Sequence, residues 1–240
     1  MAVAEWLLED PTHTHEILEE KMVKLGYLNP NVGYGPHFFH WLFIPDALFP
    51  DGKRKPYNSF GNGSAMRVSA VGWMFDSLEE TERVAGISAN ITHDHPEGIK
   101  GAQATAAAIF MARNGASKEE IKDYISKKFE YDLNRTCDQI RPSYSFDVSC
   151  QKSVPESIIA FLDSTDYEST LRLAVSLGGD SDTQACIAGA IAEAFYGIPD
   201  DIIMEASSRI PQYFKETIVK IAENSAYGSR MEQLKRCWGE

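Results

Sequence analysis

Apolar residues in this chain recur every three or four positions, which is the repeat of an amphipathic helix. Ile17, Leu18, Met22 and Leu25 share one helical side in this way. No stretch shows the strict alternation of a half-buried strand, and no strand–helix–strand rhythm occurs. The pattern predicts a compact all-α bundle, with helices over residues 1–10, 14–25, 64–72, 78–90, 95–114, 118–128, 155–163, 166–176, 183–196, 200–209 and 211–223.

Capping signals support several of these boundaries. Ser77 precedes one helix as a candidate N-cap, and Ser117 with Glu120 has the spacing of a capping box. Pro155 and Pro211 stand where a proline in the first helical turn is tolerated. These residues therefore favour helices that begin close to them.

Two long stretches carry no clear periodicity, residues 26–63 and 129–154. The first is rich in Gly, Pro, Asn and aromatic residues, and the second is polar, with room for a short extended piece. Long irregular segments in compact domains are often functional. The tail after Ala226 is mixed in charge, and we expect it to fray.

Size and charge narrow the function classes. A chain of 240 residues can bury one sizeable core, so a single domain over residues 1–240 is expected. The formal net charge of -12 disfavours broad nucleic-acid binding and anionic membranes. No window approaches the roughly 18 apolar residues of a membrane span. The four cysteines form no C-x-x-C pair, which favours reduced thiols and a cytoplasmic location.

The run from Gly178 to Thr183 is the strongest functional signal. It reads Gly-Gly-Asp-Ser-Asp-Thr and precedes an Ala/Gly-rich helix. Asp180, Asp182 and Thr183 offer hard oxygen donors, which suit Mg²⁺, Mn²⁺ or Ca²⁺. The alternative is that the two aspartates only cap the helix. One such motif is also too small to complete a metal site.

A second candidate is the loop from Gly61 to Arg67. Two glycines flank Asn62 just before a helix, where backbone N–H groups can receive a phosphate. Arg67 could pair with an anion or brace the loop. The alternative is an ordinary loop, because the run matches neither the P-loop nor the dinucleotide-binding fingerprint.

A third candidate is the sequence Thr92-His93-Asp94-His95. Its histidines could bind a metal, but no second ligand cluster has zinc-site spacing. A capping turn, with Asp94 or Thr92 as the cap and His93 contacting a ligand, is favoured. His37 and His40 stand among aromatic residues and are interpreted as packing residues.

Taken in order, Gly61–Arg67, Thr92-His93 and Gly178–Thr183 resemble the ADP-ribosylglycohydrolase family, also described as dinitrogenase-reductase-activating-glycohydrolase-like. The resemblance extends from Met1 to about residue 223 and fits in both order and spacing. It implies an orthogonal multi-helix bundle of that family's type. It also implies a binuclear Mg²⁺ or Mn²⁺ centre and hydrolysis of the glycosidic link between ADP-ribose and an acceptor.

The same resemblance assigns roles residue by residue. It implies Asp180, Asp182 and Thr183 as metal ligands and His93 as a contact of ADP-ribose. It places Asn62, Gly63, Ser64 and Met66 along the diphosphate and ribose pocket. No catalytic acid or base follows from the matched motifs.

The chain departs from the family at its start. Family members carry a Thr-Asp-Asp metal motif just before the helix that Ala2–Leu8 resembles, and this chain has none there. We therefore expect an N-terminally incomplete domain and an incomplete metal centre. With few ligands, the carboxylates of Asp180 and Asp182 repel each other, which raises the pKa of one of them.

Three functions follow as alternatives. The first is a metal-dependent hydrolase acting on an ADP-ribosylated protein or small molecule. The second is a pseudoenzyme that binds ADP-ribose or a nucleotide without cleaving it, because the Thr-Asp-Asp motif is missing. The third is a helical scaffold, which would not need the Gly178–Thr183 run. The acceptor stays open among arginine, serine, nucleic-acid bases and small molecules.

Overall fold

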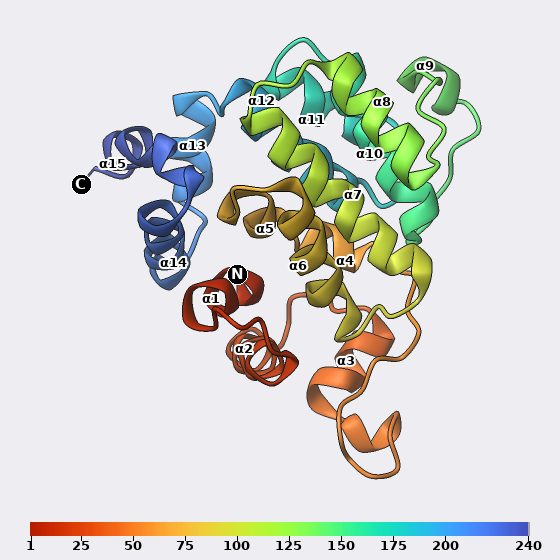
Figure 1. Cartoon of the computed structure of the whole chain (residues 1–240), viewed down its shortest axis with the longest axis vertical. Coiled ribbons are helices and arrows are strands. Elements are labelled where there is room, and N and C mark those ends of the chain that lie inside the picture. The colour runs from red at the N-terminus through yellow and green to blue at the C-terminus, as the bar shows by residue number, and fades with distance from the viewer. Residues whose placement is uncertain (240) are drawn as a thin grey trace.

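The computed structural model describes residues 1–239 as a helical molecule without strands, in agreement with the predicted all-α class (Figure 1). The only sheet-like pairing in this range is an isolated antiparallel bridge between Gly61 and Ser149. The helices are α1 (Ala2–Glu9), α2 (His15–Leu28), α3 (Pro36–Phe43), the 3-10 turn η1 (Pro45–Ala47), α4 (Gly63–Met66), α5 (Ser69–Met74), α6 (Leu78–Asn90), α7 (Pro96–Arg113), α8 (Lys118–Phe129), α9 (Cys137–Ile140), α10 (Cys150–Asp163), α11 (Tyr167–Ser176), α12 (Ser181–Tyr196), α13 (Asp200–Ser207), α14 (Gln212–Asn224), the 3-10 turn η2 (Ala226–Arg230) and α15 (Met231–Trp238). Within the same residues, no helix combines the length and apolar composition that a membrane span requires.

Helix α7 runs through the middle of the molecule and joins its two hydrophobic clusters (Figure 1). Its alanines allow this position, because small side chains let helices approach on all sides. Ala104 and Ala108 belong to the cluster built mainly from α8, α10 and α12. Ala102 and Ala106 belong to the cluster built mainly from α1, α2, α5 and α6.

The capping predictions are confirmed at two helices. The Ser77 hydroxyl accepts a hydrogen bond from the Glu80 amide at 3.2 Å at the start of α6. Ser117 and Glu120 form the reciprocal capping box that opens α8. In both cases the partners are three residues apart, so the sequence alone contains the interaction.

The irregular segment 26–63 contains a helix that the sequence analysis missed. Helix α3 begins with Pro36 in its first turn, after Gly35, and it buries Trp41 and Leu42. The first-turn proline was the available signal. Surrounding Gly and Asn residues and the shortness of the helix obscured it.

The predicted helix over residues 64–72 is wrong in detail, because it is two helices. Helix α4 ends at Met66, and α5 starts at Ser69. Between them, Arg67 turns its side chain inward to bond the Ser88 carbonyl oxygen at 2.8 Å. The chain bends here so that this cation reaches α6.

The predicted start at Pro155 is also wrong, since α10 begins at Cys150 and Pro155 lies inside it. The Cys150 amide donates to the Phe60 carbonyl oxygen at 2.8 Å, a partner 90 positions away along the chain. That contact starts the helix early, and no local signal announces it. The expected fraying after Ala226 is not seen either, because η2 and α15 are helical there.

Candidate functional site

Two motifs that are distant in the sequence meet in the structure. The side-chain nitrogen Nδ2 of Asn62 donates to Oδ2 of Asp180 at 2.7 Å. Asn62 precedes α4, and Asp180 precedes α12. The Gly61–Arg67 loop and the Gly178–Thr183 run therefore form one site.

Asp180 does not act as a simple helix cap. It occupies the N-cap position of α12, but its side chain makes no capping hydrogen bond. The carboxylates of Asp180 and Asp182 instead influence each other's pKa. Burial and the neighbouring Asp182 raise the pKa of Asp180, while the hydrogen bonds from Asp180 and the Thr183 amide lower the pKa of Asp182. The two carboxylates therefore differ in their affinity for a proton, as expected for two like charges that lie close together.

The donor set fits one side of a hard-cation site. No Lys or Arg among residues 1–239 forms a salt bridge with Asp180 or Asp182. Carboxylate oxygens that no cationic side chain neutralises suit Mg²⁺ or Mn²⁺. The same described residues contain no group of three or more His, Cys, Asp or Glu arranged around a metal. Asp180, Asp182 and Thr183 could therefore supply part of a coordination shell and not all of it.

Helix α1 begins near Cys186 of α12. The α-amino group of Met1 is buried, which lowers its pKa, and it interacts electrostatically with the thiol of Cys186. Cys186 follows Asp182 by about one turn of α12.

Hydrogen bonds to distant parts of the chain fix the Gly61–Arg67 loop in place. The Asn62 amide donates to the Val148 carbonyl oxygen at 2.7 Å, so that amide is occupied. Ser64 is fully buried, and its hydroxyl donates to the Gly98 carbonyl oxygen at 2.7 Å, which ties α4 to α7. Met66 is 42% exposed, and its sulfur accepts a hydrogen bond from Thr183. The amides of Gly63 and Ser64 lie in the first turn of α4, where helices leave donors without internal partners.

Arg67 braces the loop, and it forms no salt bridge with a carboxylate among residues 1–239. Its Nη2 donates to the Ser88 carbonyl oxygen and to Oγ1 of Thr92, both at 2.8 Å. Burial lowers the pKa of this guanidinium to about 10. Of the two roles considered for Arg67 from the sequence, the bracing role describes the structure.

His93 lies under the same loop as a neutral imidazole. Its Nδ1 shares a 2.7 Å hydrogen bond with Oγ1 of Thr92. Its Nε2 lies close to Gly61 and Gly63, where an added Cβ would be 3.4 and 3.5 Å away. Burial and the nearby Arg67 lower the pKa of His93 to about 2. The ring therefore presents an uncharged edge to the loop.

The burial of His93 predicts a pH dependence of stability. The unfolded chain protonates this residue below about pH 6.5 and the folded chain does not, so stability falls as the pH drops below about 6.5. The slope from this one group is at most about 1.4 kcal/mol per pH unit. The free energy of unfolding, measured with urea from pH 8 to pH 5, should fall less steeply with pH in His93→Asn than in the unmodified protein. The value at pH 8 isolates the cost of the substitution itself, and equal slopes would contradict the assignment.

The remaining histidines do not form a metal cluster. Nδ1 of His95 accepts a hydrogen bond from the Glu97 amide at 3.1 Å, so His95 caps α7, in place of the Asp94 or Thr92 cap expected from the sequence. Asp94 accepts from the Asn58 amide instead, at 2.6 Å.

A ring stack that sequence reasoning missed leads outward from His93. Tyr57 packs against His93 with ring centroids 6.1 Å apart, and His37 stacks on Tyr57 at 5.9 Å. His40, from the same helix as His37, contacts Phe39. The interpretation as partly buried packing residues is confirmed for His40, whereas His37 stacks on Tyr57 but is exposed. No spacing rule in the sequence connects these rings.

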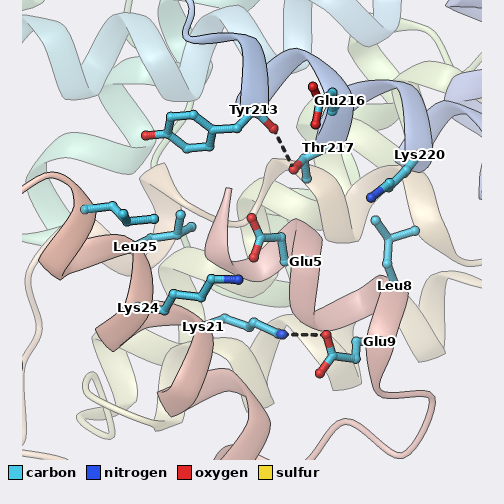
Figure 2. A pocket seen from close by; sticks show the side chains of 11 residues that line it. Glu5, Leu8, Glu9, Lys21, Lys24, Leu25, Tyr213, Glu216, Thr217 and Lys220 are labelled. Atoms are coloured by element: carbon cyan, nitrogen blue, oxygen red, sulfur yellow. Dashed lines mark hydrogen bonds and ion pairs between the residues drawn. The ribbon is translucent and has the colours of Figure 1, made fainter.

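A cavity of about 610 Å³ lies elsewhere, between α1, α2 and α14 (Figure 2). An ion pair between Lys21 and Glu9 lies on its wall, and Tyr213 and Lys220 line it from α14. None of the residues of the three motifs lines this cavity. It is therefore separate from the carboxylate pair.

Comparisons with known proteins agree with the motifs. The sequence model of a family described as ADP-ribosylglycohydrolase matches residues 5–234. ADP-ribosylhydrolase ARH3 of Homo sapiens is 28% identical, over 79% of this chain and 66% of its own length. ADP-ribosylarginine hydrolase Tri1 of Pseudomonas putida is 29% identical, over 58% of this chain and 39% of its own length. The chain thus spans less than two thirds of the length of these relatives.

The fold has a counterpart among solved structures. A chain of an ADP-ribosylglycohydrolase-related protein complex superposes with a TM-score of 0.70. The match covers 93% of this chain and 77% of the other, at 19% sequence identity. The predicted helical bundle of this type is thereby confirmed at the level of the fold.

Proposed function

Because this chain belongs to the ADP-ribosylglycohydrolase family, we propose that it is a metal-dependent hydrolase of ADP-ribosylated protein or small molecules. The reaction is cleavage of the N- or O-glycosidic bond between ADP-ribose and its acceptor.

Helix α7 contributes to both hydrophobic clusters, which supports treating residues 1–240 as one domain. The four cysteines are free thiols, which supports a reducing, cytoplasmic location.

One observation carries the proposal: Asn62 donates to Asp180 at 2.7 Å. This bond joins the loop assigned to the diphosphate to the run assigned to the metal. Either motif alone has an ordinary structural explanation. A site that places an amide-rich loop against paired carboxylates suits a ligand carrying both phosphate and sugar hydroxyls.

Each assigned residue has a role that its surroundings allow. Asp180, Asp182 and Thr183 would hold Mg²⁺ or Mn²⁺, which when bound orients the ribose hydroxyls and polarises the anomeric carbon. The first-turn amides of Gly63 and Ser64 would receive the diphosphate.

Two further residues would border the ligand. Met66 is exposed at the rim of the loop. His93 has its Nδ1 engaged by Thr92, so its Nε2 would contact ADP-ribose without adding charge.

Hydrolysis is tested with two substrates that differ in their acceptor. We expect the protein to release ADP-ribose from ADP-ribosyl-arginine or O-acetyl-ADP-ribose in the presence of Mg²⁺ or Mn²⁺. EDTA should abolish the release, and added Mn²⁺ should restore it, because the metal supplies several kcal/mol of transition-state stabilisation. Failure to release ADP-ribose from either substrate with either metal would reject the hydrolase proposal.

A second candidate is a protein that binds ADP-ribose without cleaving it. It is favoured by the small ligand set, since Asp180, Asp182 and Thr183 are oxygen donors from a single run. Calorimetry distinguishes the two candidates. Binding of ADP-ribose that is unchanged by EDTA, without turnover, would favour the second candidate, whereas metal-dependent binding with turnover would favour the first.

A further inference from the structure

The amide group of Asn62 bonds two residues at once. Its Nδ2 donates to Oδ2 of Asp180 at 2.7 Å and to Oγ of Ser153 at 3.0 Å. An amide nitrogen has two hydrogens, so both are used. Asn62, Ser153 and Asp180 come from three different parts of the fold, α4, α10 and α12.

The hydroxyl of Ser153 is itself fixed in direction. It donates its hydrogen to the Asp147 carbonyl oxygen at 3.1 Å, which leaves a lone pair for Asn62. Ser153 is fully buried, so water does not compete for this position. Tyr144 also links α10 to α12. Its hydroxyl donates to the Lys152 carbonyl oxygen at 2.8 Å and accepts from the side chain of Gln184 at 3.0 Å.

We propose that Ser153 is a positioning residue, which sets the orientation of the Asp180 carboxylate through Asn62. The inference rests on the proposed function, because it assigns Asp180 to a cation site. No motif contains Ser153, and it does not touch the cation ligands directly. It acts by holding one hydrogen of an amide so that the other points at the carboxylate.

The physical reason is the freedom of the Asn62 side chain. Asn62 occupies the N-cap position of α4 without making a capping hydrogen bond. Without Ser153, one hydrogen of a buried amide has no acceptor, and the amide turns to find one. The donor to Asp180 is then lost or misdirected. Residues that orient a metal ligand change metal affinity by about 10- to 100-fold when they are removed.

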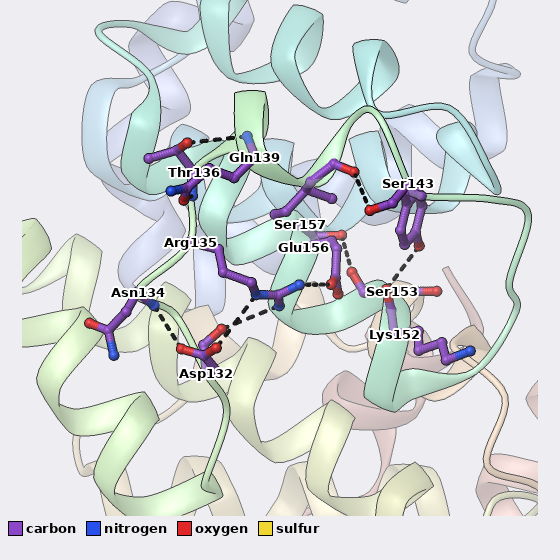
Figure 3. Close-up of polar contacts among 12 residues, drawn as sticks. Asp132, Asn134, Arg135, Thr136, Gln139, Ser143, Lys152, Ser153, Glu156 and Ser157 are labelled. Carbon is purple, nitrogen blue, oxygen red and sulfur yellow. Dashed lines mark hydrogen bonds and ion pairs between the residues drawn. The ribbon is translucent and has the colours of Figure 1, made fainter.

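The neighbouring Ser157 provides a matched control. Both serines are fully buried on α10, one turn apart, and both are labelled in Figure 3. The Ser157 hydroxyl donates to the Ser153 carbonyl oxygen at 2.7 Å, a local contact within the helix. Ser153→Ala and Ser157→Ala therefore remove the same atom from the same helix, but only the first removes a contact of Asn62.

The experiment measures Mn²⁺ binding by electron paramagnetic resonance, with thermal unfolding alongside. Ser153→Ala should weaken Mn²⁺ binding by about 10- to 100-fold, while Ser157→Ala should bind as the unmodified protein does. Ser153→Thr keeps the hydroxyl and should restore most of the affinity. Ser153→Ala should also show the larger drop in melting temperature, because it leaves a hydrogen of the buried Asn62 amide without an acceptor.

Each outcome decides the matter. Equal Mn²⁺ affinity in Ser153→Ala and Ser157→Ala, with the unmodified protein binding Mn²⁺, overturns the role of Ser153 alone. No Mn²⁺ binding by the unmodified protein overturns the cation site and this inference with it. Loss of affinity that Ser153→Thr does not recover assigns the effect to packing and also overturns the inference.

Discussion

Replacing Asp180 with Asn should lower the rate of ADP-ribose release about a thousandfold. Asn has almost the same shape, and its carbonyl oxygen can still accept the hydrogen bond that Asn62 donates at 2.7 Å. The substitution therefore removes the negative charge and leaves the fold intact. A bound metal supplies several kcal/mol of transition-state stabilisation, and about 4 kcal/mol corresponds to a thousandfold in rate. Steady-state release of ADP-ribose, together with Mn²⁺ affinity, measures the effect.

The matched control is Asp166→Asn. Asp166 is likewise the N-cap of a helix, α11, and its side chain accepts from the Ser169 amide at 2.7 Å. Asn caps helices about as well as Asp does, so this variant should keep both its activity and its stability. If Asp180→Asn kept more than about a tenth of the original activity, the activation barrier would have risen by less than about 1.4 kcal/mol. That result would show that the charge of Asp180 is not needed for the reaction.

Replacing Phe161 with Ala should lower the free energy of unfolding by about 3–5 kcal/mol, the usual cost of truncating a buried Phe. Phe161 is fully buried on α10. Its ring packs against Phe195 and Tyr196 of α12, with centroids 5.4 and 6.2 Å apart, and Lys118 of α8 lies above it at 5.1 Å. A cavity here would loosen α10 from both neighbours. Urea unfolding followed by circular dichroism measures the change.

Phe146→Ala is the control for this substitution. Its side chain is 70% exposed, so the same truncation should change stability by no more than about 0.5 kcal/mol. If Phe161→Ala and Phe146→Ala were equally stable, the side chains around residue 161 would have to repack into the cavity that the truncation leaves. That outcome would contradict the close packing between α10 and α12.

The helices that were predicted well are those whose signals are local. In α8, the capping box joins Ser117 to Glu120, three residues apart, and the apolar face repeats at helical spacing. Helix α7 was evident from its length and its alanines. The start of α10 was missed because its first amide bonds Phe60, far away in the chain. Sequence patterns report local contacts, and this boundary depends on a distant one.

For the site, the sequence alone determined which chemical groups are available. Asp180, Asp182 and Thr183 are hard donors wherever the chain places them, and glycines around Asn62 permit a tight loop in any helical fold. The order of the three motifs along the chain also points to the family.

How those groups act together depends on the way the chain packs. It joined Asn62 to Asp180, turned Arg67 inward as a brace and kept His93 uncharged by burying it. It also brought in Ser153, which no motif contains. Hydrogen bonds and desolvation act over a few ångströms in space, and packing alone determines which residues come that close.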